Sequence, residues 1–304
     1  MSDRLKDLEL FVRVAETGSF SRAGREAGLA QPTVSRMIGA LETRLGVKLL
    51  TRTTRRVVLT DAGTALIERA RSALAKVEEA ENAARGADAL SGTLRVATPV
   101  TFGAREIVPA LGSFLAEHPG LRVSLLMADR RVDLVEEGVD LAIRLGPLGD
   151  SSFVSRRLAS APRLAVASPD YLARRGEPCS PSDLAAHDIL SSQPSGSEVW
   201  TFRHPSSGET SVRLQARVAV TAVEGMLAAA RAGLGVASVS LFACRDELAT
   251  GELRRVVAGY DLAPIDVHAI MPGGRRPARK ARVFLDSLAV FLAERAPPPS
   301  NAAA

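Results

Sequence analysis

The stretch Ala30–Gly46, AQPTVSRMIGALETRLG, predicts a helix whose first turns differ from those of an ordinary amphipathic helix. Its apolar residues recur at helical spacing on one side: Val34, Met37, Ile38, Leu41 and Leu45. Pro32 suits the first turn, where a missing backbone N–H loses no hydrogen bond. Short or flexible hydrogen-bonding side chains crowd the other side of these turns: Gln31, Thr33, Ser35 and Arg36. Such a polar start favours a helix end that contacts something outside its own domain.

Two more helices precede this stretch. Residues 4–16 carry apolar side chains at helical spacing, and Thr17-Gly18 ends that helix. Ser19 or Ser21 can cap the next helix, SRAGREAG, because a serine hydroxyl accepts a bond from a first-turn amide. Residues 28–30 then form a tight turn. The order helix, helix, short turn, helix is typical of a helix-turn-helix motif.

The segments that follow predict a wing and a long linker helix. Residues 47–60 are rich in β-branched residues and read as a hairpin with Arg52–Arg56 at its tip. Asp61 is expected to cap a helix that runs to about Ala89. Apolar residues along this helix are spaced alternately by four and three positions, as in a coiled-coil seam: Leu66, Ala70, Ala73, Val77, Ala80 and Ala84. The narrow seam favours pairing with a second copy, while packing against its own chain is the alternative.

From residue 91 onward, strands alternate with helices, which predicts α/β structure with parallel sheets. Strands are expected at 93–99, 121–129, 140–146, 162–169, 200–204, 212–220, 234–240, 252–258 and 265–272. Helices are expected at 106–117, 132–137, 171–175, 222–233 (capped by Thr221) and 278–295, and residues 191–217 read as polar and largely irregular. Two lobes joined by crossing strands would bring the last helix back to the first lobe.

Charge and composition favour a protein of the cell interior with a nucleic-acid-binding module, while a solvated basic face without a partner is the alternative. The 304 residues suggest about two domains, and the net charge of +5 is concentrated in residues 1–60, which hold eleven bases and six acids. No apolar run is long enough for a membrane span, and the charged N-terminus is unlike a signal peptide, so a cytoplasmic protein is expected. Cys179 and Cys244 are expected to be buried small hydrophobes rather than a redox pair.

Three other classes of protein fit less well. An enzyme would need a catalytic constellation, but the four histidines are far apart and the sequence contains no HExxH, GxSxG, Walker A or GxGxxG motif. A periplasmic solute-binding protein would leave the basic helical module unexplained. An architectural DNA-binding protein without a ligand remains open. We therefore expect no catalytic residue, no metal site and no cofactor.

A helix-turn-helix motif explains the polar helix start. The second helix of such a motif enters the major groove and reads bases with its N-terminal residues. Gln31 can bond bidentately to adenine, Arg36 can bond guanine or phosphate, and the Thr33 methyl can touch thymine. The apolar side would hold the helix on its own domain.

The segment LELFVRVAETGSFSRAGREAGLAQPTVSRMIGALETRLGVKLLTRTTRRVVLTDAG resembles the N-terminal signature of the LysR-type transcriptional regulators, and residues 4–63 match almost without interruption. DLVEEGVDLAIRLG, SRRLASAPRLAVASPDYLARRG, DLAAHD and AAARAGLGVA extend the resemblance to the branch with a periplasmic-binding-protein-like effector domain. The resemblance implies an α/β chain with an N-terminal all-α winged helix-turn-helix. The implied domains are 1–60 for DNA binding, 61–89 for dimerisation, 92–296 for effector binding and 297–304 as a disordered tail. Its first lobe is expected at about 92–161 and 266–296, and its second at about 162–265.

The resemblance also implies partners and contacts. Expected partners are double-stranded DNA with a pseudo-palindromic operator, a second copy through the linker helix, a tetramer, RNA polymerase and an unidentified small-molecule effector. The implied DNA-contacting residues are Ser21, Gln31, Pro32, Thr33, Ser35, Arg36, Arg52, Thr53, Arg55 and Arg56.

The implied effector site is a cleft between the lobes. Open α/β sheets bind ligands beyond the C-terminal ends of their strands, and a helix start there favours an anion. The candidates at these positions are Val100, Thr101, Phe102, Ala128, Arg144, Gly146, Thr221, Val223 and Glu224, and Trp200 and Phe202 of the second lobe are further candidates. Capping, ion pairing or core packing is the alternative role for each of them.

Overall fold

The computed structural model describes residues 4–52, 57–84, 90–130, 134, 137–148, 154–192, 196–206, 208–271 and 277–295. The chain divides into two compact units, Met1–Leu90 and Ser91–Ala304. Each unit has its own buried core, so each is described by itself.

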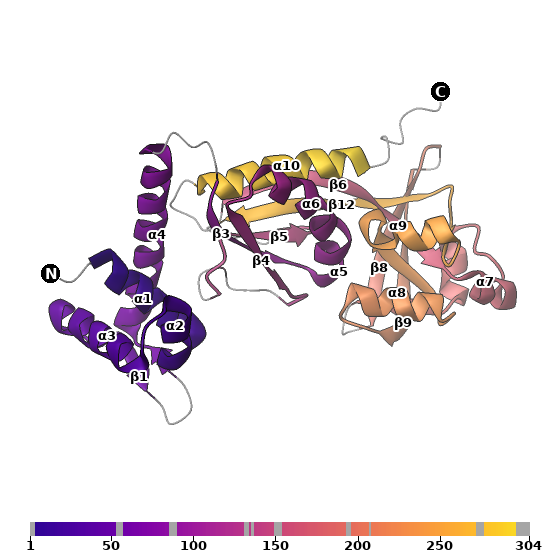
Figure 1. Cartoon of the computed structure of the whole chain (residues 1–304). Helices are drawn as coiled ribbons and strands as arrows, with labels where there is room; N and C mark the ends of the chain where they lie inside the picture. Colours follow the sequence, from indigo (N-terminus) through magenta and orange to yellow (C-terminus); the bar gives the residue numbers. More distant parts are fainter. Residues whose placement is uncertain are drawn as a thin grey trace. The chain divides into compact units, whose positions relative to one another are not determined.

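The first unit is a helical domain with a small hairpin (Figure 1). Its elements are α1 (Arg4–Thr17), α2 (Phe20–Ala27), α3 (Gln31–Leu45), β1 (Leu50–Arg52), β2 (Val57–Leu59) and α4 (Asp61–Ala84). Phe11 and Val14 of α1, Val34 and Leu41 of α3, and Leu49 beside the hairpin are almost fully buried in one core. β1 and β2 pair antiparallel, with Leu50 opposite Leu59. The helix-turn-helix with a hairpin wing is therefore confirmed.

Local signals set the ends of these helices. Ser19, one of the two predicted caps, accepts a hydrogen bond from the Arg22 amide at 3.3 Å. Gly28 ends α2 with φ +66°, a left-handed conformation that glycine adopts without steric cost. The cap of α4 was predicted wrongly, because the Thr60 hydroxyl accepts from the Gly63 amide at 3.0 Å and Asp61 is already helical.

Two predicted apolar faces are only partly buried. Leu45, expected on the buried side of α3, is 41 % exposed because it belongs to the last turn, beyond the core. On α4, Ala70 of the predicted seam is 2 % exposed, and Leu66 packs against the core of the first unit. The start of the seam therefore packs against its own chain, which was the alternative reading of this segment.

The second unit is built on one ten-stranded mixed sheet with the order β11-β6-β10-β7-β9-β8-β12-β5-β3-β4. Its strands are β3 (Gly92–Thr98), β4 (Leu121–Met127), β5 (Leu141–Leu145), β6 (Val154–Ala167), β7 (Ile189–Ser191), β8 (Ser197–His204), β9 (Gly208–Ala219), β10 (Val236–Ser240), β11 (Arg254–Val256) and β12 (Asp261–Met271). Its helices are α5 (Val100–Phe102), the π-helical turn η1 (Gly103–Ile107), α6 (Val108–Glu117), α7 (Pro169–Arg175), the 3-10 helix η2 (Pro181–Ala186), α8 (Val223–Arg231), α9 (Leu241–Thr250) and α10 (Arg279–Arg295).

Two long strands join two lobes of this unit. β6 pairs with β12 from Val154 to Arg163, and its last part, from Arg163 on, pairs with β10 and β11. β3 pairs in parallel with β4 and β5 in the first lobe, and β7 to β11 lie in the second. Helix α10 packs on α6, where the rings of Phe284 and Phe114 are 5.3 Å apart (Figure 1). The crossing strands and the return of the last helix to the first lobe are as predicted.

Several predicted elements differ in extent. β6 begins at Val154 rather than at residue 162. Its first four residues are exposed and show no apolar alternation, so the local pattern did not indicate a strand there. The strands expected at 200–204 and 212–220 are longer than predicted and pair with each other as the β8–β9 hairpin, which leaves less of this segment irregular than expected. The helix expected from Glu106 begins earlier, at Val100. Helix α9 was not predicted, because its buried side includes the charged residue Glu247 and so lacks a purely apolar face. The short helix expected at 132–137 lies mostly outside the described residues.

Candidate functional site

The N-terminal turns of α3 present a polar surface above a buried apolar face. Gln31, Pro32 and Arg36 are exposed, and Thr33 and Ser35 are half-buried. The N-cap residue Ala30 offers no side chain to the first amides of the helix. Ser21 is exposed on α2, and Arg52 lies in β1, opposite Val57. Thr53, Arg55 and Arg56 lie outside the described residues.

A buried carboxylate fixes α3 to the wing. Glu42 is 7 % exposed, and its oxygens accept hydrogen bonds from Lys48 Nζ at 2.6 Å and from the amides of Leu49 at 2.9 Å and Leu50 at 3.2 Å. Burial opposes ionisation of Glu42, but these hydrogen bonds outweigh it and lower its pKa. The carboxylate therefore stays charged and holds the start of β1 against the C-terminal half of α3.

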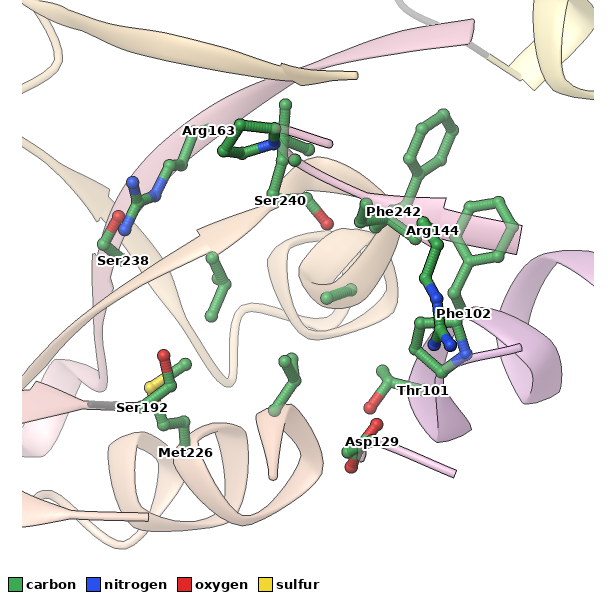
Figure 2. Close-up of a pocket in the computed structure, with 18 of the residues that line it drawn as sticks. Thr101, Phe102, Asp129, Arg144, Arg163, Ser192, Met226, Ser238, Ser240 and Phe242 are labelled. Atoms are coloured by element: carbon green, nitrogen blue, oxygen red, sulfur yellow. The ribbon is translucent and has the colours of Figure 1, made fainter. Parts of the chain in front are cut away.

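A cavity of about 590 Å³ lies between the two lobes of the second unit (Figure 2). It is lined from the first lobe by the start of α5 and the end of β5, and from the second by β6, β10, α8 and α9. Phe102, Met226, Val239 and Phe242 supply apolar walls. A volume of this size, apolar walls and a few polar groups are typical of small-molecule sites.

Six of the nine predicted effector residues line this cavity: Thr101, Phe102, Arg144, Gly146, Thr221 and Val223. Thr221 was expected to cap α8, but the N-cap residue is Ala222 and no side chain caps the helix.

The other three predicted residues are not among the cavity-lining residues, each for a visible reason. Val100 is 38 % exposed, and its amide donates to Asp129 Oδ1 at 3.0 Å, so a protein carboxylate already occupies the helix start where an anion was expected. Ala128 packs against an apolar cluster of the first lobe. Glu224 pairs with Arg105 at 3.3 Å. Trp200 and Phe202 are each 1 % exposed and belong to the core of the second lobe.

Sequence reasoning missed the polar groups that β6 and β10 bring to the cavity. Arg163, Ser238 and Ser240 all line it. The two serines alternate with apolar residues along the fully buried strand VASVS, which was a signal that could have been read. The hydroxyls of Thr101 and Ser238 are buried and form no hydrogen bond with any residue that the structure describes. Buried hydroxyls without partners are costly, which points to a ligand that satisfies them.

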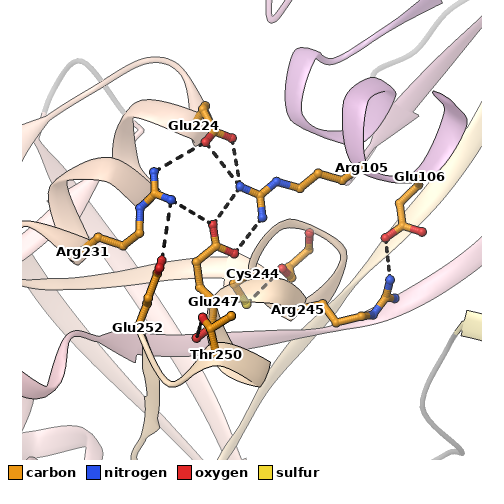
Figure 3. A network of polar contacts seen from close by, with 10 residues as sticks. Arg105, Glu106, Glu224, Arg231, Cys244, Arg245, Glu247, Thr250 and Glu252 are labelled. Atoms are coloured by element: carbon orange, nitrogen blue, oxygen red, sulfur yellow. Dashed lines mark hydrogen bonds and ion pairs between the residues drawn. The ribbon is translucent and has the colours of Figure 1, made fainter. Parts of the chain in front are cut away.

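Ion pairs join the lobes beside the cavity (Figure 3). Arg105, in the turn η1 of the first lobe, donates to Glu247 of α9 at 2.7 and 2.8 Å and to Glu224 of α8 at 3.3 Å. Arg245 of α9 in turn donates to Glu106 of η1 at 2.8 Å, and Glu106 is 1 % exposed. The hydrogen bonds that Arg105 donates to Glu247 raise the pKa of Arg105, so this guanidinium stays charged. We call these five residues the interlobe ion-pair cluster.

The two cysteines have different environments. Cys244 is fully buried beside this cluster, and burial raises the pKa of its thiol to about 12. Cys179, also expected to be buried, is exposed. Among the described residues, no group of three or more His, Cys, Asp or Glu could hold a metal ion, and no helix is long and apolar enough to cross a membrane.

Comparison with known proteins identifies both units. Residues 5–64 match the family model described as bacterial regulatory helix-turn-helix protein, lysR family, and residues 87–292 match the LysR substrate binding domain. A relative from Escherichia coli (strain K12), named Uncharacterized HTH-type transcriptional regulator YhjC, is 36 % identical over 96 % of this chain and 99 % of its own.

Solved full-length structures agree. CrgA, a LysR-type transcriptional regulator from Neisseria meningitidis, is 30 % identical with a TM-score of 0.55 over 94 % of this chain and 96 % of its own. The Vibrio cholerae virulence activator AphB is 26 % identical with a TM-score of 0.58 over 96 % of this chain and 99 % of its own. The chain therefore belongs to the LysR family, as a transcriptional regulator with a DNA-binding helix-turn-helix and an effector-binding domain.

Proposed function

We propose that this regulator reads operator DNA with the first turns of α3 and that a small-molecule effector in the interlobe cavity controls this binding. The observation that carries the first part is the division of α3 into two sides. Val34, Ile38 and Leu41 are buried, while Gln31 and Arg36 are exposed on the early turns. A helix held in this way offers its N-terminal side chains to the major groove.

Different residues of the first unit would have different roles on DNA. Gln31, Pro32, Thr33, Ser35 and Arg36 face the bases in this proposal, and Ser21 contacts a phosphate. Arg52, Thr53, Arg55 and Arg56 of the wing hold phosphates or enter the minor groove. Base contacts decide which sequence is preferred, while phosphate contacts set affinity and its dependence on salt.

Operator binding at several salt concentrations tests these roles. Gln31→Ala and Arg36→Ala should reduce the preference for operator over scrambled DNA, each by about 1–3 kcal/mol. Arg55→Ala should weaken binding to every duplex and lower the slope of log affinity against log salt by about one. Arg203→Ala removes the same charge from an exposed residue of the second unit, 76 % of whose side chain is accessible, and serves as the control. Unchanged discrimination in Arg36→Ala together with an unchanged slope in Arg55→Ala would contradict the proposal.

The cavity between the lobes supports the effector part of the proposal. Its apolar walls and its two unpartnered hydroxyls, Thr101 and Ser238, are groups that a ligand would satisfy. A ligand there would touch both lobes, so its binding would favour one arrangement of the lobes over others. No catalytic activity is proposed for this site.

Two chains would pair through residues 61–89 and present two recognition helices to a pseudo-palindromic operator. Ala73 of α4 is exposed and Val77 is half-buried, so this part of the helix has apolar surface available for a partner.

We further propose a tetramer of two such dimers, contact with RNA polymerase, and a cytoplasmic location, where the operator DNA is found. The domains are 1–60, 61–89 and 92–296, with lobes at about 92–161 plus 266–296 and 162–265, and a tail at 297–304.

A further inference from the structure

Arg163 is a cation in the interlobe cavity that has no ion-pair partner among the residues the structure describes. It is half-buried on β6, and among the described residues no hydrogen bond or ion pair joins it to the protein. Burial lowers the pKa of its guanidinium, and Glu198 is the one carboxylate that opposes this effect. The oxygens of Glu198 already accept hydrogen bonds from Ser191 and from Trp200 Nε1. A partly buried charge left in this way is unfavourable until an anion reaches it.

The strand register places two serine residues of β10 near Arg163. Arg163 is directly opposite Ser240 in the antiparallel pair β6–β10, and Ser238 is two residues away on the same face. Ser238 is 7 % exposed, and its hydroxyl has no hydrogen-bond partner. Figure 2 shows the guanidinium of Arg163 and the hydroxyl of Ser238 at the same end of the cavity. A guanidinium and hydroxyl donors side by side suit a planar oxyanion such as a carboxylate.

The rest of the cavity indicates the body of the ligand. Met226, Val239 and Phe242 supply apolar walls. Thr101 lies at the end of the cavity opposite Arg163 (Figure 2), and its buried hydroxyl also has no partner among the described residues. An inorganic anion would leave these apolar walls and the Thr101 hydroxyl without contacts. An organic acid with an apolar body would use both.

We propose that the cavity binds a small organic carboxylate whose acidic group is held by Arg163 and Ser238 and whose apolar body lies on Met226 and Phe242. This inference rests on the proposed effector site and specifies its chemistry. It makes Arg163 and Ser238 the residues that set specificity for an acid over its uncharged analogues.

The first test needs no ligand. In the full-length protein in low-salt buffer, Arg163→Met should raise the melting temperature, because it removes an uncompensated charge and keeps an apolar side chain of similar length. Arg157→Met is the matched control on the same strand, where an exposed arginine pairs with Asp266 at 3.4 Å, and it should change the melting temperature little. A fall in the melting temperature of Arg163→Met would identify this guanidinium as a structural group and overturn the proposal.

The second test uses matched pairs of acid and amide. Benzoate, phenylacetate, hexanoate and adipate are compared with their primary amides, and inorganic phosphate is a further probe. At millimolar concentration, at least one acid should raise the melting temperature by several degrees, while its amide should not. Arg163→Gln and Ser238→Ala should lose most of this shift, and Arg157→Gln should retain it.

Each of the other results has a definite meaning. Equal shifts by acids and amides, no shift by any acid, or an undiminished shift in Arg163→Gln would overturn the carboxylate site. A response to phosphate that equals or exceeds that to the acids would overturn the organic body. A neutral compound that changes operator binding through the cavity would refute the acid but leave the proposed function intact. An acid that binds at Arg163 without altering operator binding would support the carboxylate site and contradict the proposed control of DNA binding.

Discussion

At the scale of single residues, Glu42 shows how one buried carboxylate holds α3 in place. It accepts three hydrogen bonds, from Lys48 and from two backbone amides at the start of the wing. Charge-assisted bonds of this kind are stronger than neutral ones, and backbone amides cannot move away when their acceptor is lost. The position of α3 relative to the wing therefore depends on a buried residue outside the polar first turns of the helix.

Replacing this carboxylate should destabilise the protein in a pH-dependent way. Glu42→Gln should lower the free energy of unfolding of the first unit by about 1–3 kcal/mol at neutral pH, because an amide makes weaker bonds to the same donors. The pKa of Glu42 is lowered by folding from its ordinary value of 4.5, so its contribution is present above that value and is lost as the pH falls through the folded-state pKa.

Melting curves of the wild type and Glu42→Gln across the acid range measure this contribution. The difference between the two proteins should be constant near neutrality and shrink below pH 4.5. A difference that grows on acidification would contradict the assigned hydrogen bonds.

At the scale of elements, close approach of α2 to the turn and to α3 sets the geometry of the helix-turn-helix. A Cβ atom at Gly24 would lie 2.6 Å from the Leu29 carbonyl oxygen and 3.2 Å from Val34 Cγ2. The backbone of the turn cannot yield as a flexible side chain would. The fold of this motif therefore requires a residue without a side chain at position 24.

Two glycine substitutions in the same motif should act in opposite directions. Gly24→Ala should cost about 1–3 kcal/mol in stability because it overpacks the turn. At Gly39, inside α3, an added Cβ would meet no atom within 4 Å, so Gly39→Ala should stabilise the helix by about 0.5–1 kcal/mol. Urea denaturation of both variants measures the two changes in the free energy of unfolding. If Gly24→Ala were as stable as Gly39→Ala, the helices would be able to move apart at position 24.

At the scale of the whole effector-binding unit, charge links the two lobes beside the cavity. The carboxylate of Glu247 is 4 % exposed and takes both of its short bonds from Arg105 of the other lobe. Without Arg105, this buried carboxylate would lose both short bonds and keep only the 3.5 Å contact with Arg231 of its own lobe. The arrangement of the lobes that forms the cavity is thus supported by the interlobe ion-pair cluster.

A double-mutant cycle measures this coupling. Arg105→Leu should destabilise the second unit by about 3 kcal/mol, and Arg105→Leu combined with Glu247→Leu should recover part of that loss, because no unpaired charge stays buried. Arg130→Leu, at an ion pair whose arginine is 69 % exposed, should change stability by no more than about 1 kcal/mol. Additive losses in the double variant would show that the two residues do not support each other.

The sequence by itself determined what depends on neighbours along the chain. Apolar spacing, the cap at Ser19 and the glycine turn at Gly28 predicted the helix-turn-helix, and the alternation of strands and helices predicted the two-lobed sheet. These signals are local, because helix periodicity, caps and positive φ angles involve residues a few positions apart.

Tertiary structure alone decided how the cavity is built. It brings together Thr101, Arg163 and Ser238, and their meeting depends on the register of β6 and β10 and on the approach of two lobes. The same approach gave Glu224 an arginine partner, and packing within the second lobe placed Trp200 in its core. A side chain's neighbours across a sheet or between lobes leave no trace in local spacing, because the same residue types serve a core, an ion pair or a ligand equally well.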